Sequence, residues 1–242
     1  MIRTVLLCFT AMFGVTLGAS TSTAAPADEV EQVTERLFTA VGDRLVWAGM
    51  TSSIVYTQLY GQTDAGTVDA IIMTDYPQRR FRIDAIGANI HLVRVVDGEK
   101  DRSWRLDRPL REEDTADLQR KDLGPYLAQA FRTLQRVALS DPALKLTIAR
   151  KGGLDELEVY EGAARIAWYR LDARNEPFMM GVRDDNVGVI CGPWDVERDR
   201  IRYPGWLTRP DGSWRVTVKS LAVNIRTDER LFSQPVVTSQ SP

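Results

Sequence analysis

The chain has 242 residues, with 31 Lys and Arg against 33 Asp and Glu, and its formal net charge is −2 at pH 7. The charges are mixed along the chain rather than gathered in blocks, which argues against a nucleic-acid surface or a polybasic membrane patch. The chain contains one His and two Cys, too few for a His- or Cys-based zinc site. We therefore expect no metal and no cofactor.

The N-terminus has the pattern of a secretory signal peptide. Arg3 supplies a positive start, Val5–Ala19 is a continuous apolar stretch, and small residues follow it. The stretch is shorter than the roughly 20 residues that a membrane-spanning helix needs. We predict a signal peptide over 1–27, cleaved between about 24 and 27, and export to the periplasm as a soluble chain; a retained N-terminal anchor is the alternative. Residues 28–236 would then form one domain, and 237–242 a polar tail.

Two segments have the apolar spacing of amphipathic helices. The first begins near Asp28 and ends near Gly49, and its apolar stripe consists of Val30, Val33, Leu37, Val41 and Leu45. The second runs from Leu123 to Pro142, and its stripe consists of Leu123, Leu127, Phe131, Leu134 and Val137. A polar, charged loop precedes the second helix. Each stripe needs an apolar surface to cover.

The remaining segments alternate with a period of two and are separated by turn residues. Between the two helices lie candidate strands over 52–61, 67–76, 79–86, 90–98 and 102–107, joined by connections so short that they favour an antiparallel meander. Further short strands follow Pro142, for a total of about ten to twelve. We predict an α+β fold with a single large curved antiparallel sheet, an incomplete β-barrel whose concave face is covered by helices.

The segment 200–221 predicts a hairpin near the end of this sheet. In "RPDG", Pro210 presets φ and Gly212 supplies a positive φ, so Trp206 and Trp214 are expected on paired strands. The apolar positions change parity beyond Ser220, which predicts a β-bulge that bends the sheet.

The chain offers no concentrated catalytic signal. His91 lies in a strand pattern and is interpreted as a half-buried strand histidine, and nothing around Cys191 indicates an activated thiolate. No Ser lies in a Gly-x-Ser-x-Gly elbow. The acidic residues Asp155, Glu156, Glu158 and Glu161 are the only candidates for a carboxylate hydrolase, and they occupy ordinary strand or turn positions. We predict a protein that is not an enzyme and has no catalytic residues.

Apolar and aromatic side chains are the more informative feature. If a curved sheet is incompletely packed by its helices, the concave side leaves an apolar cavity, which is the usual form of a small-ligand site. The candidate residues for an apolar ligand are Phe81, Ile83, Trp104, Leu106, Leu127, Phe131, Trp168, Trp206, Trp214 and Val216. The alternative is that these side chains fill the core.

Several motifs, taken in order, resemble a known family. They are "YPQRRFRID" (76–84), "VVDGEKDRSWRLD" (95–107), "WYRLD" (168–172), "WDVERDRIRYP" (194–204) and "LAVNIRTDERLFSQP" (221–235). Together they are similar to the periplasmic lipoprotein-carrier superfamily, the LolA/LolB-like or outer membrane lipoprotein-sorting group. The chain differs from that pattern in a longer gap between Asp-Gly and Trp, and at Asp199-Arg200, where the family has a Gly.

The resemblance implies a half-barrel with a helical lid and an apolar cavity for acyl chains. From it we expect a monomeric, non-enzymatic periplasmic carrier that binds the acyl chains of a lipid or lipoprotein, with an envelope protein as a further candidate partner and no nucleic acid. The alternative is an envelope regulatory or partner-binding module on the same fold with a filled core, because fold membership does not decide the cargo.

Overall fold

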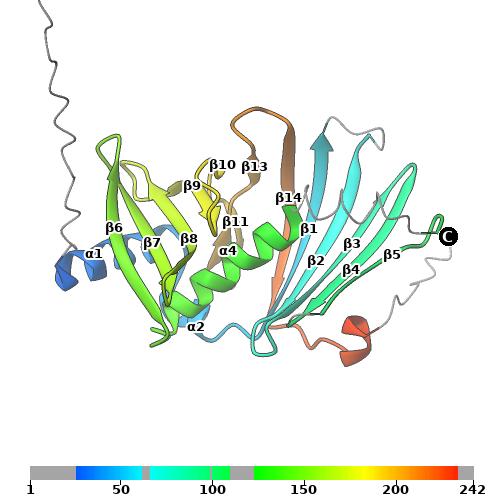
Figure 1. Ribbon diagram of the computed structural model, residues 1–242, viewed down its shortest axis with the longest axis horizontal. Coiled ribbons are helices and arrows are strands. Elements are labelled where there is room, and N and C mark those ends of the chain that lie inside the picture. The colour runs from blue at the N-terminus through cyan, green and yellow to red at the C-terminus, as the bar shows by residue number, and fades with distance from the viewer. Residues whose placement is uncertain (1–25, 62–65, 99, 110–122, 234–242) are drawn as a thin grey trace, which may run out of the picture.

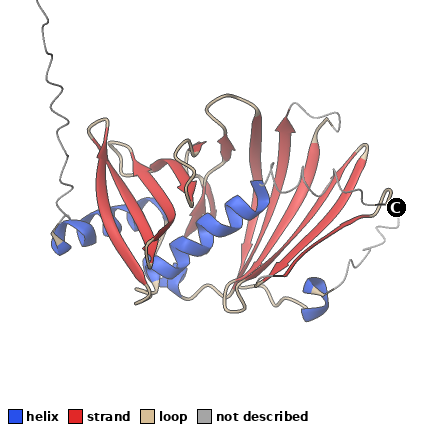
Figure 2. Cartoon of the chain, viewed as in Figure 1, coloured by secondary structure: helices blue, strands red, loops and turns tan. Residues whose placement is uncertain are grey.

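The computed structural model describes residues 26–61, 66–98, 100–109 and 123–233; residues 1–25 of the predicted signal peptide, residues 110–122 before the second helix and the predicted polar tail lie outside these ranges. The described residues form one open 12-stranded antiparallel sheet with few helices, which confirms the predicted fold class (Figures 1 and 2). The strand order across the sheet is β5-β4-β3-β2-β1-β14-β13-β10-β9-β8-β7-β6. The predicted meander is therefore present as β1 to β5, while the pairing of β1 with β14 joins segments far apart in the sequence.

The bounds of the strands follow the predicted alternation closely. The first half of the sheet contains β1 (Ser52–Gly61), β2 (Val68–Asp75), β3 (Arg80–Gly87), β4 (Ile90–Asp97) and β5 (Lys100–Arg105). The second half contains β6 (Leu144–Lys151), β7 (Leu154–Glu161), β8 (Ala164–Leu171), β9 (Pro177–Val182) and β10 (Val189–Cys191). The predicted hairpin of β13 (Trp206–Thr208) and β14 (Trp214–Val223) is present, but it lies between the halves and not near the end of the sheet as predicted. β11 (Val196–Arg198) pairs with β12 (Ile201–Tyr203) in a separate hairpin.

The helices lie mainly on one side of the sheet. Helix α1 (Ala27–Val41) contacts β6, β7 and β12, whereas α4 (Leu123–Ala138) contacts β8 and β9 in one half and β2 and β3 in the other. Figure 1 shows α4 crossing the middle of the sheet between the two halves. A short helix, α2 (Arg44–Ala48), packs against α4, and a 3-10 turn, η1 (Glu229–Phe232), lies against β3 and β4.

The first predicted helix is divided in two, which corrects the assignment of Leu45 to its apolar stripe. Helix α1 ends at Gly42, whose φ is 117°, and the carboxylate of Asp43 accepts hydrogen bonds from the backbone N–H groups of Leu45 and Val46 to cap α2. The side chain of Leu45 is 82% exposed. A Cβ at Gly42 would overlap the carbonyl oxygen of Arg200, so the break also lets the β11–β12 hairpin approach.

The turn of this hairpin is formed by Asp199 and Arg200. Asp199 and Arg200 have φ values of 51° and 64°, in the left-handed region that favours Gly. The backbone N–H of Asp43 donates to the carbonyl of Arg200 at 2.9 Å, and the Arg200 guanidinium bonds the Asp43 carboxylate at 2.7 Å. These contacts hold the turn against the start of α2.

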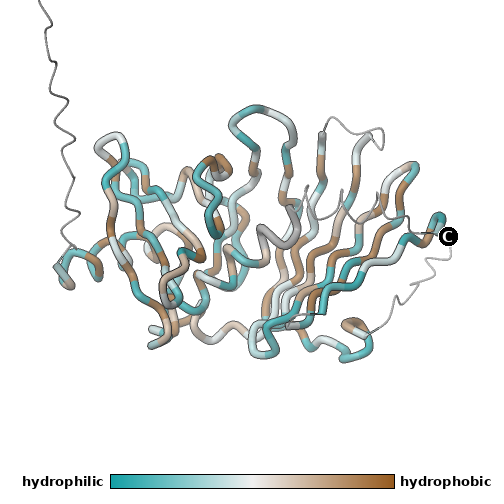
Figure 3. Tube along the Cα trace, in the orientation of Figure 1, coloured by the Kyte–Doolittle hydropathy of each residue, from teal (hydrophilic) through white to brown (hydrophobic). Residues whose placement is uncertain are grey.

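The sheet has two distinct faces, which we call the inner face and the outer face. The inner face packs against α1 and α4 and includes Val55, Ile72 and Ile83 in the first half and Leu157 and Tyr169 in the second, all within one hydrophobic core. Side chains of opposite parity point to the outer face. Figure 3 shows the resulting alternation of hydropathy along the strands.

The predicted bulge is confirmed in β14. Tyr56 of β1 pairs with Ser220 and Thr57 pairs with Val218, so Lys219 has no residue opposite it. The extra residue keeps Val218 and Leu221 both buried against the inner-face core although their sequence parity differs.

Candidate functional site

Six of the ten predicted ligand residues belong to the inner face or to α4, the helix that covers it, and the side chains of five of them are described. Ile83 and Phe131 belong to the main core, and Phe81 and Trp214 pack against it as partly buried side chains. Val216 is 1% exposed and pairs with Leu59 and Leu207 in the neighbouring strands. These residues lie on the side where the cavity was predicted, and their contact with a ligand stays a prediction.

Trp104 and Leu106 lie on the opposite side of the sheet. Both pack with Val93, Val95 and Phe232 in a second, smaller apolar cluster beneath η1. The guanidinium of Arg80 lies over the Phe232 ring at 4.3 Å and bonds the Glu229 carboxylate, so η1 is fastened to the outer face. Trp104 and Leu106 therefore have protein partners remote from α4.

Trp168 and Trp206 also lie on the outer face, against glycines in β9 and at the two ends of β10. A Cβ at Gly181 or Gly188 would overlap the Trp168 indole, and one at Gly192 would overlap that of Trp206. Trp168 is 1% exposed, and its Nε1–H donates to the carbonyl of Asp185 at 2.7 Å. The side chain of Leu127, the tenth candidate, lies outside the described residues. The fold thus does not gather the ten residues around one site.

The inner face has an apolar area that the sequence prediction did not include. On β1 to β4, a set of apolar side chains lies on the same face as Ile83 but outside the main core cluster; we call it the inner strip. The inner strip consists of Leu59, Val68, Ala70, Ala85 and Leu92, and it adjoins Val216. The ten candidate residues do not include it, whereas the period-2 alternation of the strands contains the signal that finds it.

The inner strip ends at a charged border on β4 and on β5, the edge strand. Arg94 is 6% exposed on the inner face opposite Ile83, and its Nε donates to the Asp101 carboxylate at 2.9 Å. On the same face, Arg105 forms an ion pair with Asp107, and this contact together with a backbone hydrogen bond from His91 holds the pKa of the Asp107 carboxyl well below its usual range. The apolar surface therefore lies between the core and a row of ion pairs.

The space beneath the second half of α4 is filled by aromatic rings. Phe131 stacks on Tyr203 with a centroid distance of 3.9 Å, and Trp47 stacks on Tyr203 at 5.9 Å. The Tyr169 hydroxyl donates to the carbonyl of Ala130 at 2.6 Å, which ties α4 to β8. Burial raises the pKa of the Tyr203 hydroxyl, which shares a hydrogen bond with Tyr76 at 3.2 Å. This part of α4 is an integral part of the core.

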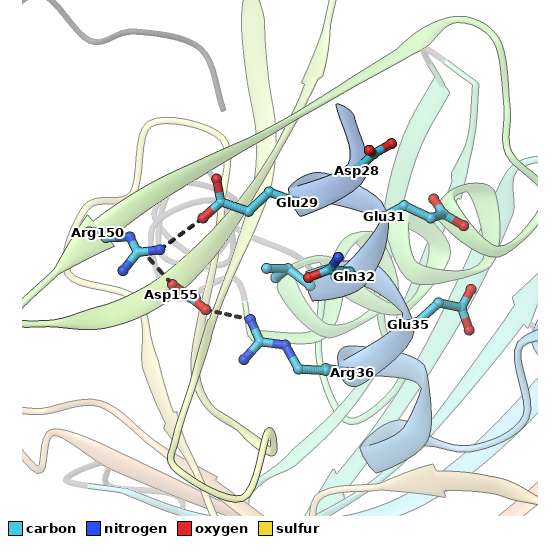
Figure 4. Close-up of a pocket in the computed structure, with 9 residues that line it drawn as sticks. Asp28, Glu29, Glu31, Gln32, Glu35, Arg36, Arg150 and Asp155 are labelled. Carbon is cyan, nitrogen blue, oxygen red and sulfur yellow. Dashed lines mark hydrogen bonds and ion pairs between the residues drawn. The ribbon is translucent and has the colours of Figure 1, made fainter. Parts of the chain in front are cut away.

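A hollow of about 710 Å³ lies where α1 passes the ends of β6 and β7. Figure 4 shows its acidic residues on α1 and the ion pairs that close one side. The Arg36 guanidinium bonds the Asp155 carboxylate, and Arg150 bonds Glu29 at 2.8 Å and approaches Asp155 at 3.8 Å. Nine residues line the hollow: Asp28, Glu29, Glu31, Gln32, Val33, Glu35, Arg36, Arg150 and Asp155. Its lining is mostly charged and does not match the apolar cavity that an acyl chain needs.

The residues considered for catalysis have other contacts. The four carboxylates proposed as hydrolase candidates, Asp155, Glu156, Glu158 and Glu161, each form an ion pair with an arginine. His91 on β4 is half-buried, as expected, and Cys191 is on β10, with five strands between them in the sheet. Burial raises the pKa of the Cys191 thiol well above its usual value, which opposes thiolate formation. Among the described residues, no group of three or more His, Cys, Asp or Glu is arranged to hold a metal ion.

Comparison with known proteins identifies similarity in structure and none in sequence. No protein-family model matches the chain, and no curated protein matches its sequence. A DUF1329 family protein from Desulfovibrio piger is similar with a TM-score of 0.39 and 10% identity, over 86% of this chain and 97% of that chain. The Mycobacterium tuberculosis lipoprotein LppX is similar with a TM-score of 0.29 and 10% identity, over 84% of this chain and 99% of that chain. None of the described helices is long and apolar enough to cross a membrane. Structural similarities of this size do not assign the chain to a family.

Proposed function

We propose that the chain is an exported periplasmic carrier that binds the acyl chains of a lipid or lipoprotein without catalysing a reaction. The observation that carries this proposal is the inner strip, an apolar area that continues across β1 to β4 beyond the core beneath α4. An acyl chain laid along it would bury methylene groups, each contributing about 0.8 kcal/mol. The predicted signal peptide and the family resemblance support the proposed compartment and the class of ligand.

The inner strip is a better place for an acyl chain than the space beneath α4. Phe131 and Tyr203 already fill that space in close contact. Displacing α4 there would separate stacked rings and break the hydrogen bond between Tyr169 and Ala130. We therefore place the ligand against Leu59, Ala70 and Ala85, which lie beyond the filled part of the core.

The filled core favours a second candidate, an envelope regulatory module that binds a protein partner and carries no lipid. Four aromatic rings, from Trp47, Phe131, Trp194 and Tyr203, pack together beneath α4, as expected of a core that needs no ligand. Under this alternative the inner strip is covered by the protein itself.

A pair of variants on one strand tests the first proposal. Leu59→Glu places a charge on the inner strip, whereas Tyr56→Glu places the same charge on the outer face of β1, where Tyr56 is 44% exposed. We expect Leu59→Glu to weaken binding of a fluorescent fatty acid at least about tenfold, because a carboxylate beside an acyl chain is poorly solvated. Tyr56→Glu should leave the affinity within about twofold, since an exposed substitution of this kind has a small effect.

Native mass spectrometry of the purified mature chain provides the independent measurement. Acyl species that co-purify with the wild type and are lost in Leu59→Glu support the carrier. A wild-type protein free of lipid that also fails to bind the fluorescent fatty acid contradicts it and favours the partner-binding module. Far-UV circular dichroism of both variants establishes that a loss of binding is not a loss of folding.

A further inference from the structure

A second hollow, of about 280 Å³, lies on the outer face of β6 to β8 and is separate from the proposed acyl site. Its lining residues come from three strands and the loop after β9, and they are Lys151, Glu156, Arg165, Trp168, Arg170 and Asn186. Glu156 pairs with Ala149 of β6 on one side and with Arg170 of β8 on the other, and Ala149 has the smallest side chain of the three. The hollow therefore has three cationic side chains around it and an indole in its wall.

Two of the cations are held in position by carboxylates. The Nε and Nη2 atoms of Arg170 both donate to Oε2 of Glu156, at 2.9 and 2.6 Å. Arg165 donates to Oε1 of Glu158 at 3.1 Å and also bonds the side-chain oxygen of Asn186. The side chains of Arg165 and Arg170 are only 15% and 22% exposed, so their guanidinium groups are fixed in advance of binding.

Lys151 differs because it is exposed and forms no ion pair with any described residue. The hollow has three positive charges, from Lys151, Arg165 and Arg170, and two negative charges that pair with the arginines, from Glu156 and Glu158. One positive charge is therefore left uncompensated. Of the two arginines, Arg170 lies nearer to Lys151 in the strand register, and a guanidinium fixed in position beside a free ammonium suits the binding of a phosphate group.

Glu156 adds a second requirement for the ligand. Its side chain is 2% exposed, and both bonds from Arg170 go to Oε2, so Oε1 accepts no hydrogen bond from any described residue. Both oxygens of Glu158, by contrast, accept hydrogen bonds. Oε1 accepts one from Arg165, and Oε2 accepts one from the Tyr160 hydroxyl at 3.0 Å and one from the Thr147 hydroxyl at 3.4 Å. A nearly buried carboxylate oxygen that lines a hollow favours a ligand with a hydroxyl or ammonium donor.

We propose that this hollow binds a phosphate ester that carries a hydroxyl or ammonium donor, with the phosphate at Lys151 and Arg170, which lie near one another in the strand register, and the donor at Glu156 between them. The volume suits a small ester and is at the lower end for ligand pockets. Such a group occurs both in soluble esters and in the headgroups of phospholipids. The chemistry of recognition is the same for the two sources, and the experiment separates them.

The first arm uses soluble ligands and the full mature chain. Calorimetric titration with glycerol 3-phosphate, which has hydroxyl donors, is compared with methyl phosphate, which has none. We expect glycerol 3-phosphate to bind about tenfold more tightly, because its hydroxyl reaches a charged acceptor. Lys151→Gln should weaken its binding about threefold, since an exposed cation contributes modestly. The matched control is Lys145→Gln, which alters the other lysine on this face of the same strand, outside the lining of the hollow.

The second arm uses vesicles. Phosphatidylglycerol has a phosphate and glycerol hydroxyls, whereas phosphatidylcholine lacks a donor. Co-sedimentation with phosphatidylglycerol vesicles alone, reduced by Lys151→Gln and not by Lys145→Gln, assigns the hollow to a lipid headgroup. Binding of glycerol 3-phosphate without binding of vesicles assigns it to a soluble ester. The proposal is overturned if neither arm shows saturable binding, if the two esters bind equally, or if the two lysine variants have the same effect.

Discussion

At the scale of single residues, the tryptophans of the outer face show how a large side chain is accommodated. The Trp168 ring occupies space that exists because Gly181 and Gly188 have no side chains, and its N–H is satisfied by the carbonyl of Asp185. Arg170 lies over the ring at 5.4 Å. Trp168 is therefore fixed by its neighbours, and its aromatic surface is used in packing.

We predict that Gly181→Ala destabilises the protein by about 1–3 kcal/mol, because the new methyl group overlaps the indole of Trp168 in a tightly packed site. The free energy of unfolding in urea measures the effect. In a Trp168→Leu background the same substitution should cost much less, because the clashing ring is gone. Strictly additive costs in this double-mutant cycle would show that Trp168 is not the cause.

At the scale of elements, the end of α4 is joined to the sheet by one arginine. Arg136 is 6% exposed; its Nε donates to Asp141 at 2.7 Å and its Nη2 to Glu161, at the end of β7, at 2.6 Å. The Arg136 guanidinium lowers the pKa of the Glu161 carboxyl, and a backbone N–H from Ala143 together with Arg136 lowers that of Asp141. The helix end, the turn that follows it and β7 are thus held by one ionised group.

The ion pair between Arg136 and Glu161 predicts that the free energy of unfolding depends on pH. Because the pKa of Glu161 is lower in the folded state than its ordinary value of 4.5, the ionised group stabilises the fold above that value, and this stabilisation is lost as the pH falls through the folded pKa. Glu161→Gln should reduce the free energy of unfolding by about 0.5–1 kcal/mol at neutral pH, a modest effect because Glu161 is 45% exposed.

Urea unfolding of wild type and Glu161→Gln near neutral pH and again near pH 3 checks this expectation, with the two proteins approaching equal stability in acid. Glu176→Gln is the control, since Glu176 forms no ion pair with any described residue and should show no such convergence. A difference between wild type and Glu161→Gln that is the same at both pH values would contradict the role of the ionised carboxylate.

At the scale of the whole molecule, the two halves of the sheet are joined by short strands and by one shared core. β10 and β13 contain three residues each, so few backbone pairs link the halves. The hydrophobic core nevertheless runs without a break from Val55 and Ile83 in one half to Leu157 and Tyr169 in the other, with Phe131 of α4 among them.

We predict that the mature chain unfolds in a single cooperative transition, because neither half can lose its inner face without exposing core residues of the other. Urea unfolding followed by far-UV circular dichroism and by tryptophan fluorescence should give the same midpoint. Two transitions, or midpoints that differ between the probes, would mean that the shared core beneath α4 does not couple the halves.

Local sequence patterns determined the elements and the fold class of this protein. The period-2 alternation placed β1 to β5 to within about two residues, and the parity change after Ser220 identified the bulge, because both follow from the geometry of a strand with one buried face. Gly42 and Asp43 also indicate a helix end followed by a helix start. The spacing of the apolar stripe instead favoured one continuous helix, which was wrong.

Only the tertiary structure decided which face of each strand meets α4 and which strands far apart in the sequence become neighbours. The period-2 alternation of the sequence predicts that Trp104 and Leu106 share a face of the sheet, but it does not indicate whether η1 or α4 covers that face. The pairing of β1 with β14 and the approach of glycines to Trp168 depend in the same way on contacts between distant segments. Periodicity is a local property of the backbone, whereas the side on which a helix packs depends on the free energy of the whole core.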